Sequence, residues 1–257
     1  MHITEQVTMV GDTRIFHREA GAGFPLVLLH GGGGTGKAFW HQLQGLGEQF
    51  RVLAPDMPGF GKSDWAPGAT TVDDLAPVLW AWADVLGLER LALGGNSMGG
   101  RVALAMALSA PARVVRLALL DAVGVSVPGV APLNPLTVPP AEFVSTMVHD
   151  PEHYRQVTPY RTLEDARELN AGRAAFARYL AAAPIGPDRS AELGRLTMPV
   201  LLIWGRHDRV VPLPLGEALA ERLPHARLVV LEDVGHLPHI EAAGAVNQLL
   251  ADFLAGV

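Results

Sequence analysis

Residues 91–104 read LALGGNSMGGRVAL, an apolar run that ends in a Gly-x-Ser-x-Gly turn and continues as a helical pattern. This pattern is typical of a nucleophile elbow, in which a serine on a sharp strand-to-helix turn presents its hydroxyl at the edge of a sheet. Glycines two residues before and after the serine let two backbone segments pass close together. Ser97 is therefore the first candidate for a nucleophile. Because the chain has 28 glycines in 257 residues, such a spacing also arises by chance, and the surrounding sequence has to decide.

The composition indicates a globular protein that acts on a small molecule. The 257 residues are 49% hydrophobic, which is enough for a sizeable core. The formal charge of −6, without a run of Lys or Arg, predicts neither a nucleic-acid partner nor a membrane partner. The absence of cysteine excludes disulfides, thiolate metal sites and a cysteine nucleophile. No apolar stretch approaches the roughly 18 residues of a membrane span, and the polar N-terminus differs from a signal peptide. We expect a cytoplasmic protein, for which either a monomer or a homodimer is compatible with the sequence.

Apolar stretches alternate with amphipathic ones around the elbow, which predicts an α/β fold with a mostly parallel, doubly wound sheet of about eight strands. Besides the strand of the elbow itself, strands are expected at residues 3–10, 13–19, 25–29, 51–54, 114–120, 199–205 and 227–231. Further helices are expected at residues 39–50, 71–88, 163–180, 214–223 and 240–254. Thr71 or Asp73 is available as N-cap of the 71–88 helix, and Pro77 predicts a late start or a kink there.

The alternation stops after Asp121. Residues 124–140 contain five prolines, no strand pattern appears before Pro199, and residues 141–183 have helical patterns. A connection of about 70 residues is far longer than an ordinary crossover. We therefore predict a helical cap, or lid, at 122–195, inserted into a core of residues 1–121 and 196–257. The alternative is an ordinary pair of crossover helices.

Reactive side chains follow several of the predicted strands at the carboxyl edge of the sheet, where ligands gather in this class of fold. A serine nucleophile needs an imidazole to take its proton and a carboxylate to fix the imidazole tautomer. Ser97, Asp208 and His236 supply these groups in that order, and the 28 residues from Asp208 to His236 fit one helix plus one strand. Asp121 is a rival for the acid because it also follows a strand, and we rank it below Asp208.

A turn of four consecutive glycines follows the strand at residues 25–29 and predicts an oxyanion hole. The N–H group of Met98, at the start of a helix, is one donor by position. The second is expected from Gly32, with Gly33 as the alternative. His30 is expected to hold the turn by hydrogen bonds. The alternative is that these glycines only make the turn flexible.

Several motifs, taken in order, are similar to those of one family. Over essentially its whole length the chain resembles the α/β-hydrolase superfamily, in its serine-nucleophile branch. The motifs are His30-Gly31, residues 95–100 (GNSMGG), residues 204–212 (WGRHDRVVP) and Gly235-His236.

Within that superfamily, the chain resembles the meta-cleavage-product hydrolases, which cleave carbon–carbon bonds in vinylogous 1,5-diketones. The resemblance rests on Asn96 before the serine, on PGFGKSD at residues 58–64 and on the Trp-Gly-Arg segment. Leu237 departs from it, because that family commonly has Trp directly after the histidine. The resemblance also implies a cap arginine that binds substrate, for which the candidates are Arg161, Arg167 and Arg173.

We predict a serine hydrolase that acts on a small carbonyl substrate, a carboxylic ester or lactone in the first place, without cofactor or metal. Asn96, Gly31 and Leu237 are the candidate substrate contacts. Hydrolysis of a carbon–carbon bond in a meta-cleavage product ranks slightly below this prediction. A ligand-sensing protein of the same fold, with little turnover, is a third possibility.

Overall fold

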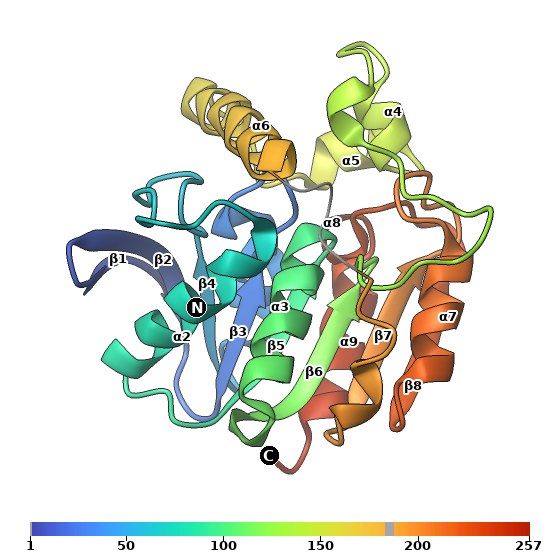
Figure 1. Cartoon of the computed structure of the whole chain (residues 1–257). Coiled ribbons are helices and arrows are strands. Elements are labelled where there is room, and N and C mark those ends of the chain that lie inside the picture. The colour runs from blue at the N-terminus through green and yellow to red at the C-terminus, as the bar shows by residue number, and fades with distance from the viewer. Residues whose placement is uncertain (1, 183–187) are drawn as a thin grey trace.

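One eight-stranded sheet forms the centre of the computed structural model, which describes residues 2–182 and 188–257 (Figure 1). The strands in chain order are β1 (Ile3–Val10), β2 (Thr13–Ala20), β3 (Pro25–Leu29), β4 (Arg51–Pro55), β5 (Leu91–Asn96), β6 (Val114–Leu120), β7 (Val200–Gly205) and β8 (Ala226–Leu231). Their order across the sheet is β1-β2-β4-β3-β5-β6-β7-β8. Strand β2 is antiparallel to β1 and β4, and the other pairs are parallel. The predicted α/β fold and its number of strands are confirmed.

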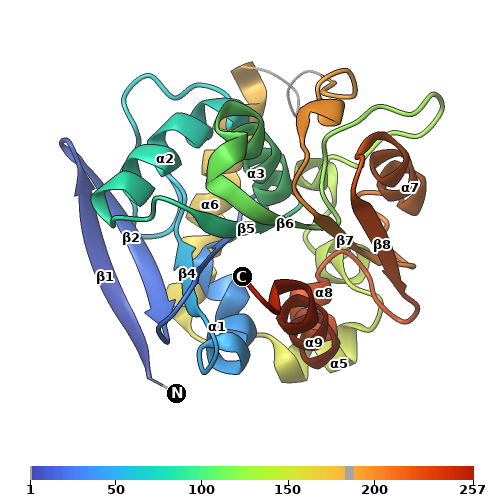
Figure 2. The ribbon, with the colours of Figure 1, turned by 90° about the horizontal axis from the view of Figure 1, so that it is seen from below.

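Helices cover both faces of the sheet (Figure 2). One face carries α1 (Trp40–Leu46) and α9 (Ala243–Leu254), and the other carries α2 (Leu75–Val85), α3 (Met98–Ser109) and α7 (Leu213–Arg222). Successive side chains of a strand point to opposite faces. Leu26 and Leu28 of β3 therefore pack on the face covered by α1 and α9, while Val27 and Leu29 pack on the face covered by α2, α3 and α7. A strand buried on both faces has to be apolar throughout, which explains the continuous apolar runs in the sequence.

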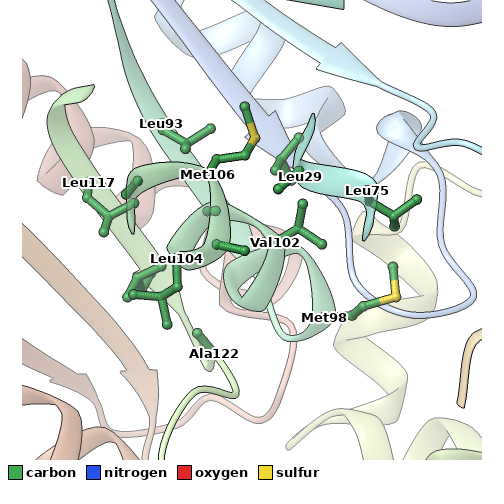
Figure 3. Packing of buried hydrophobic residues seen from close by; sticks show 14 of the residues in the cluster. Leu29, Leu75, Leu93, Met98, Val102, Leu104, Met106, Leu117 and Ala122 are labelled. Carbon is green, nitrogen blue, oxygen red and sulfur yellow. The ribbon is translucent and has the colours of Figure 1, made fainter. Parts of the chain in front are cut away.

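Helix α3, which follows the elbow, is buried along almost its whole length. Figure 3 shows its Val102 and Leu104 among apolar side chains of the neighbouring strands and of α2. A shift of this helix would disturb the core on that face of the sheet, and interiors are packed too densely to absorb such a shift. The start of α3, and with it the elbow, is therefore held rigidly.

Two predicted helices begin differently from a simple reading of their patterns. The 71–88 segment opens with a 3-10 turn, capped by Thr71 and Asp74, and α2 begins only at Leu75. Pro77 therefore lies in the first turn of α2, where its missing N–H group costs little, so the expected late start is confirmed. The 240–254 prediction was wrong at its start. Ala242 leaves the helical conformation (φ −128°, ψ 44°) and separates α8 (Pro238–Glu241) from α9, because the end of α8 is bonded to the preceding loop by the Glu241 side chain.

The segment between β6 and β7 contains α4 (Phe143–Met147), α5 (Pro151–Val157) and α6 (Leu163–Ala182), which lie above the carboxyl edge of the sheet (Figure 1). An ion pair of 2.5 Å between Lys37 Nζ and Asp165 Oδ1 ties the first turn of α6 to the core. In the described residues of the segment between β6 and β7, the only β-structure is an isolated bridge between Val127 and Val130. The division at 122–195 stays a prediction, and its residues 183–187 lie outside the described part of the chain. Within the two described ranges, no helix is long and apolar enough to cross a membrane.

Candidate active site

Ser97 lies between β5 and α3 in a backbone conformation that is uncommon for a residue with a side chain. Its φ is 55° and its ψ −116°, and its N–H group donates to the carbonyl oxygen of Leu120 at 2.9 Å. A β-carbon at Gly99 would lie 2.0 Å from the carbonyl oxygen of Leu29, and one at Gly95 would lie 2.4 Å from the carbonyl group of Gly99. Both glycines of the Gly-x-Ser-x-Gly pattern are thus required by close backbone contacts, and the strained turn presents the serine at the edge of the sheet.

His236 and Asp208 are hydrogen-bonded, with 2.7 Å between His236 Nδ1 and Asp208 Oδ2. The loop after β7 places Asp208, and the loop after β8 places His236. The other oxygen of the carboxylate, Oδ1, accepts the N–H groups of Val210 at 2.7 Å and Val211 at 2.9 Å. Both side chains are buried. This carboxylate is therefore fixed in orientation and can hold one tautomer of the imidazole.

Asp121, the rival acid, lies behind this pair. It is fully buried with a φ of 45°, and its Oδ1 accepts the N–H group of Gly205 at 2.9 Å. Burial and the neighbouring Asp208 carboxylate raise the pKa of Asp121 well above its usual range. This shift favours the protonated form of Asp121, which avoids placing a second buried charge beside Asp208.

The glycine turn after β3 is held from both sides. His30 is buried, its Nε2 accepts the N–H group of Met57 at 3.0 Å, and its Nδ1 lies 2.9 Å from the carbonyl oxygen of Gly31. Burial lowers the pKa of His30, so the ring is neutral and donates from Nδ1. The predicted role of His30 in holding the turn is thus confirmed. On the other side, the ring of Phe176 in α6 lies so close that a β-carbon at Gly32 would be 2.6 Å from it.

A cavity between the sheet edge and the segment that joins β6 to β7 brings most of the predicted site residues together. Among the candidate cap arginines, Arg173 lines this cavity, whereas Arg161 borders a separate surface groove and Arg167 is exposed. Asp208 is not among the described lining residues, and it is hydrogen-bonded to His236, which is. The predicted residues in the lining are Gly31, Gly32, Gly33, Asn96, Ser97, Met98, His236 and Leu237.

The amide group of Asn96 is committed to the backbone. Its Nδ2 donates to the carbonyl oxygens of Leu120 at 3.2 Å and His236 at 3.0 Å, and the side chain is 1% exposed. Both amide hydrogens are thereby used to join the end of β6 to the histidine loop. Of the Asn96 side chain, only Oδ1 is left for contact with a ligand.

Glu241 is a residue that the sequence reasoning missed. Its buried carboxylate accepts the N–H groups of His149 at 2.7 Å, Gly235 at 3.1 Å and Leu237 at 3.2 Å. Burial raises the pKa of Glu241, and the three N–H groups oppose this effect. The carboxylate thus fixes the backbone on both sides of His236 and joins it to the loop between α4 and α5. The available signal was a glutamate five residues after the histidine, where one helical turn brings it back to the loop.

Among residues 2–182 and 188–257, two groups of imidazole and carboxylate side chains have possible metal-ligand atoms within 4.8 Å of one another. In the first group the Asp208 carboxylate and the His236 imidazole already bind each other. The second lies nearer the surface, where two of its rings stack at 4.1 Å. The expected absence of a metal stays a prediction. The groups are Asp121, Asp208 and His236, and His149, His207 and Asp233.

Comparison with known proteins agrees with this architecture. The sequence model of the alpha/beta hydrolase family matches residues 26–249. The 2-hydroxy-6-oxononadienedioate/2-hydroxy-6-oxononatrienedioate hydrolase of Paraburkholderia phymatum is 35% identical over 95% of this chain and 91% of its own. The 2-hydroxy-6-oxo-6-phenylhexa-2,4-dienoate hydrolase of Burkholderia cepacia is 32% identical over 94% of this chain and 91% of its own. A thermophilic esterase from Thermogutta terrifontis superposes with a TM-score of 0.77 at 27% identity, over 99% of this chain and 98% of its own. The chain belongs to the alpha/beta hydrolase family, and it is a hydrolase.

Proposed function

We propose that the protein hydrolyses a carbon–carbon bond in a 2-hydroxy-6-oxodienoic acid, the class of vinylogous diketone produced by meta-cleavage of aromatic rings. The two relatives described above are named for substrates of this class. Sequence reasoning ranked an ester or lactone slightly higher. The names of these relatives favour the opposite order, whereas the family model supports the ester reading only at the level of the whole hydrolase family.

The observation that carries the proposal is the cation of Arg173 in the wall of the cavity. Its guanidinium lies 4.3 Å from the centre of the Phe143 ring, and the described lining residues include no Asp or Glu. A cation in an apolar site is costly unless an anion pairs with it, and a substrate carboxylate would supply that anion. A neutral ester would not need this group.

In the proposed mechanism, Ser97 attacks the carbonyl carbon C6 of the substrate. First, with the help of His236, the proton of the enol hydroxyl moves to C5, which produces a keto acid. His236 then takes the proton of Ser97, Asp208 stabilises the imidazolium, and the N–H groups of Met98 and Gly32 hold the oxyanion at C6. When the C5–C6 bond breaks, its electrons go to C5 and are delocalised onto the C2 carbonyl oxygen. The imidazolium of His236 gives its proton to the leaving dienolate, which departs as a neutral dienol at that oxygen. The neutral His236 then takes a proton from water, which attacks the acyl group, and returns that proton to the Ser97 oxygen as the acid is released.

Hydrolysis of an ester or lactone is the second candidate. Leu237 favours it, because this aliphatic side chain lines the cavity where the resembling carbon–carbon hydrolases commonly have Trp. The similarity to an esterase structure is a further argument for this candidate. To compare the two candidates, kcat/KM is measured for a 2-hydroxy-6-oxo-6-phenyl dienoate, by loss of its absorbance, and for p-nitrophenyl acetate. A kcat/KM that is higher for the ester would reverse the proposal.

Replacing Arg173 with glutamine should lower kcat/KM for the dienoate by about 10- to 100-fold, because a hydrogen bond to a charged group is lost. The same variant should change kcat/KM for p-nitrophenyl acetate by less than about threefold, since that ester has no carboxylate. Arg167→Gln, on the exposed side of the same helix, is the matched control. Equal losses on the two substrates would contradict the role given to Arg173.

Replacing Glu241 with glutamine should lower kcat by about tenfold or more and leave KM within about threefold, because the loop that orients His236 loses charge-assisted hydrogen bonds. Steady-state kinetics separate the two constants, and thermal unfolding reports on stability. The exposed Glu221→Gln on α7 is the control. A fall in melting temperature with unchanged kcat would show that Glu241 stabilises the fold without positioning the histidine.

A further inference from the structure

Three side chains outside the cavity form a cluster in which each comes from a different segment of the chain. His149 lies in the loop between α4 and α5, His207 directly precedes Asp208 in the loop after β7, and Asp233 lies in the loop after β8. One possible metal-ligand atom of each lies within 4.8 Å of the other two. None of the three is among the described residues that line the cavity, so the cluster is separate from the substrate site.

Backbone contacts hold these three segments together beneath the cluster. The N–H group of His207 donates to the carbonyl oxygen of Val234 at 2.9 Å, which joins the loops after β7 and β8. The N–H group of His149 donates to the Glu241 carboxylate at 2.7 Å. The loops also pack closely, because a β-carbon at Gly235 would lie 2.7 Å from the backbone nitrogen of His149. The backbone that carries the three side chains is therefore fixed in advance, and a ligand bound there has little ordering to impose on it.

The ring of His149 has both nitrogens available. Within the part of the chain that the structure describes, its Nδ1 is buried and has no hydrogen-bond partner. Its Nε2 lies 4.0 Å from Asp233 Oδ1, which is too far for a hydrogen bond. The neighbouring His153 differs, because its Nε2 lies 3.0 Å from the carbonyl oxygen of Glu241. A neutral imidazole binds metal ions through either nitrogen, so His149 can act as a ligand where His153 is already committed.

The other two side chains are free to adjust to an ion. The side chain of Asp233 is 93% exposed, and His207 is also exposed. The rings of His149 and His207 stack at 4.1 Å with 22° between their planes, so their lone pairs lie side by side. A turn of the His207 ring and a rotation of Asp233 would bring the ligand atoms to the separation of about 3.3 Å that a tetrahedral zinc site with bonds of about 2.0–2.1 Å requires.

We propose that His149, His207 and Asp233 bind a divalent transition-metal ion, zinc in the first place, with water as the fourth ligand. Two imidazoles and one carboxylate suit zinc and its neighbours in the first transition row, whereas calcium and magnesium prefer oxygen ligands alone. The ion ties the segment between β6 and β7 to the loops that carry Asp208 and His236, and it takes no part in the reaction. The absence of a metal predicted from the sequence would then hold for the chemistry and not for the fold.

Calorimetric titration of the metal-free protein with Zn²⁺, in a buffer that does not chelate the ion, tests the site. We expect one Zn²⁺ per chain in the wild type and an affinity at least about 100-fold weaker in His207→Ala, because loss of a ligand should cost no less than loss of a group that orients one. His225→Ala removes another exposed imidazole and should bind as the wild type does. A wild type that does not bind Zn²⁺, or a His207→Ala variant of equal affinity, would overturn the inference.

Thermal unfolding tests whether the ion ties the segments together. Zn²⁺ at about 100 times its Kd should raise the melting temperature of the wild type by about 5–10 °C, because it binds only the folded chain. Asp233→Ala should lose most of this shift. Asp12→Ala, at an exposed aspartate in the β1–β2 turn, is the matched control and should keep it. An equal shift in Asp233→Ala would show that the stabilising ion binds elsewhere.

The group formed by Asp121, Asp208 and His236 is the rival location for the ion. His236→Ala distinguishes the two, because under our inference this variant keeps the Zn²⁺ affinity of the wild type. A loss of affinity in His236→Ala without a loss in His207→Ala would place the ion at the candidate catalytic residues and overturn the inference.

Discussion

Replacing Ser97 with alanine is expected to lower kcat by about 10⁴- to 10⁶-fold, the range found when a nucleophile that acts together with a histidine and an acid is removed. The strained turn, the glycine contacts with the backbone of β3 and the buried helix α3 have the joint effect of presenting this side chain to the cavity. Alanine keeps the backbone in place and removes only the oxygen that attacks. The loss should therefore be in kcat, with substrate binding retained.

Single-turnover measurements of the dienoate absorbance, together with titration of bound substrate, separate these two effects. Ser126→Ala, at an exposed serine of the segment between β6 and β7, is the control and should behave as the wild type. Residual turnover within tenfold of the wild type would remove Ser97 from the mechanism. A wild-type protein that binds the dienoates tightly but turns over neither a dienoate nor an ester would favour the ligand-sensing alternative.

The second large effect is expected from Asp208→Asn, which should lower kcat by about 10³- to 10⁴-fold. An amide at this position cannot accept a hydrogen bond from His236 Nδ1 with the strength of a carboxylate, and it no longer stabilises the imidazolium. The 2.7 Å contact of Asp208 with His236 and the two N–H groups on its other oxygen are the reason for this expectation.

Asp121→Asn provides the matched comparison. Burial and the Asp208 carboxylate raise the pKa of Asp121 well above its usual range, which favours the neutral form of the side chain, and asparagine is a neutral side chain of nearly the same shape. We expect kcat of this variant to stay within about tenfold of the wild type, because replacing a neutral carboxyl group with a neutral amide changes little of the charge around Asp208. Steady-state kinetics give kcat for both variants, and the pH dependence of kcat/KM shows whether the titration of the catalytic groups has changed. A larger loss at Asp121 than at Asp208 would exchange their proposed roles.

Much of the fold could be predicted because the local patterns agree with the global arrangement. Continuous apolar runs such as residues 25–29 mark strands that are covered on both faces, and Gly11 at the turn of the β1–β2 hairpin has a positive φ of 58°. The break at Ala242 was not predictable from local patterns. It depends on the Glu241 carboxylate reaching back to Gly235 and Leu237, which is a tertiary contact.

For the site, too, local patterns predicted some features, and others depended on tertiary contacts. Strand ends and chain order were sufficient to select Ser97, Asp208 and His236 as candidates, because the carboxyl ends of parallel strands share one edge. Choosing among the cap arginines required knowledge of which face of α6 points to the cavity. Helical spacing contained part of this information, because one face of α6 presents an apolar stripe interrupted by a single cation. The residues of that face in the cavity lining are Leu169, Arg173, Phe176 and Leu180.

The contact between α6 and the glycine turn has a consequence for the divergence of this protein. A β-carbon at Gly172 would lie 2.6 Å from the carbonyl oxygen of Gly33, and Phe176 leaves no room for one at Gly32. The helix that contributes Arg173 to the cavity therefore also supports the backbone proposed to hold the oxyanion. A change in α6 that alters the substrate range should therefore also alter the reaction rate. A chimera in which residues 122–195 are replaced by the corresponding segment of a relative should change in both properties at once.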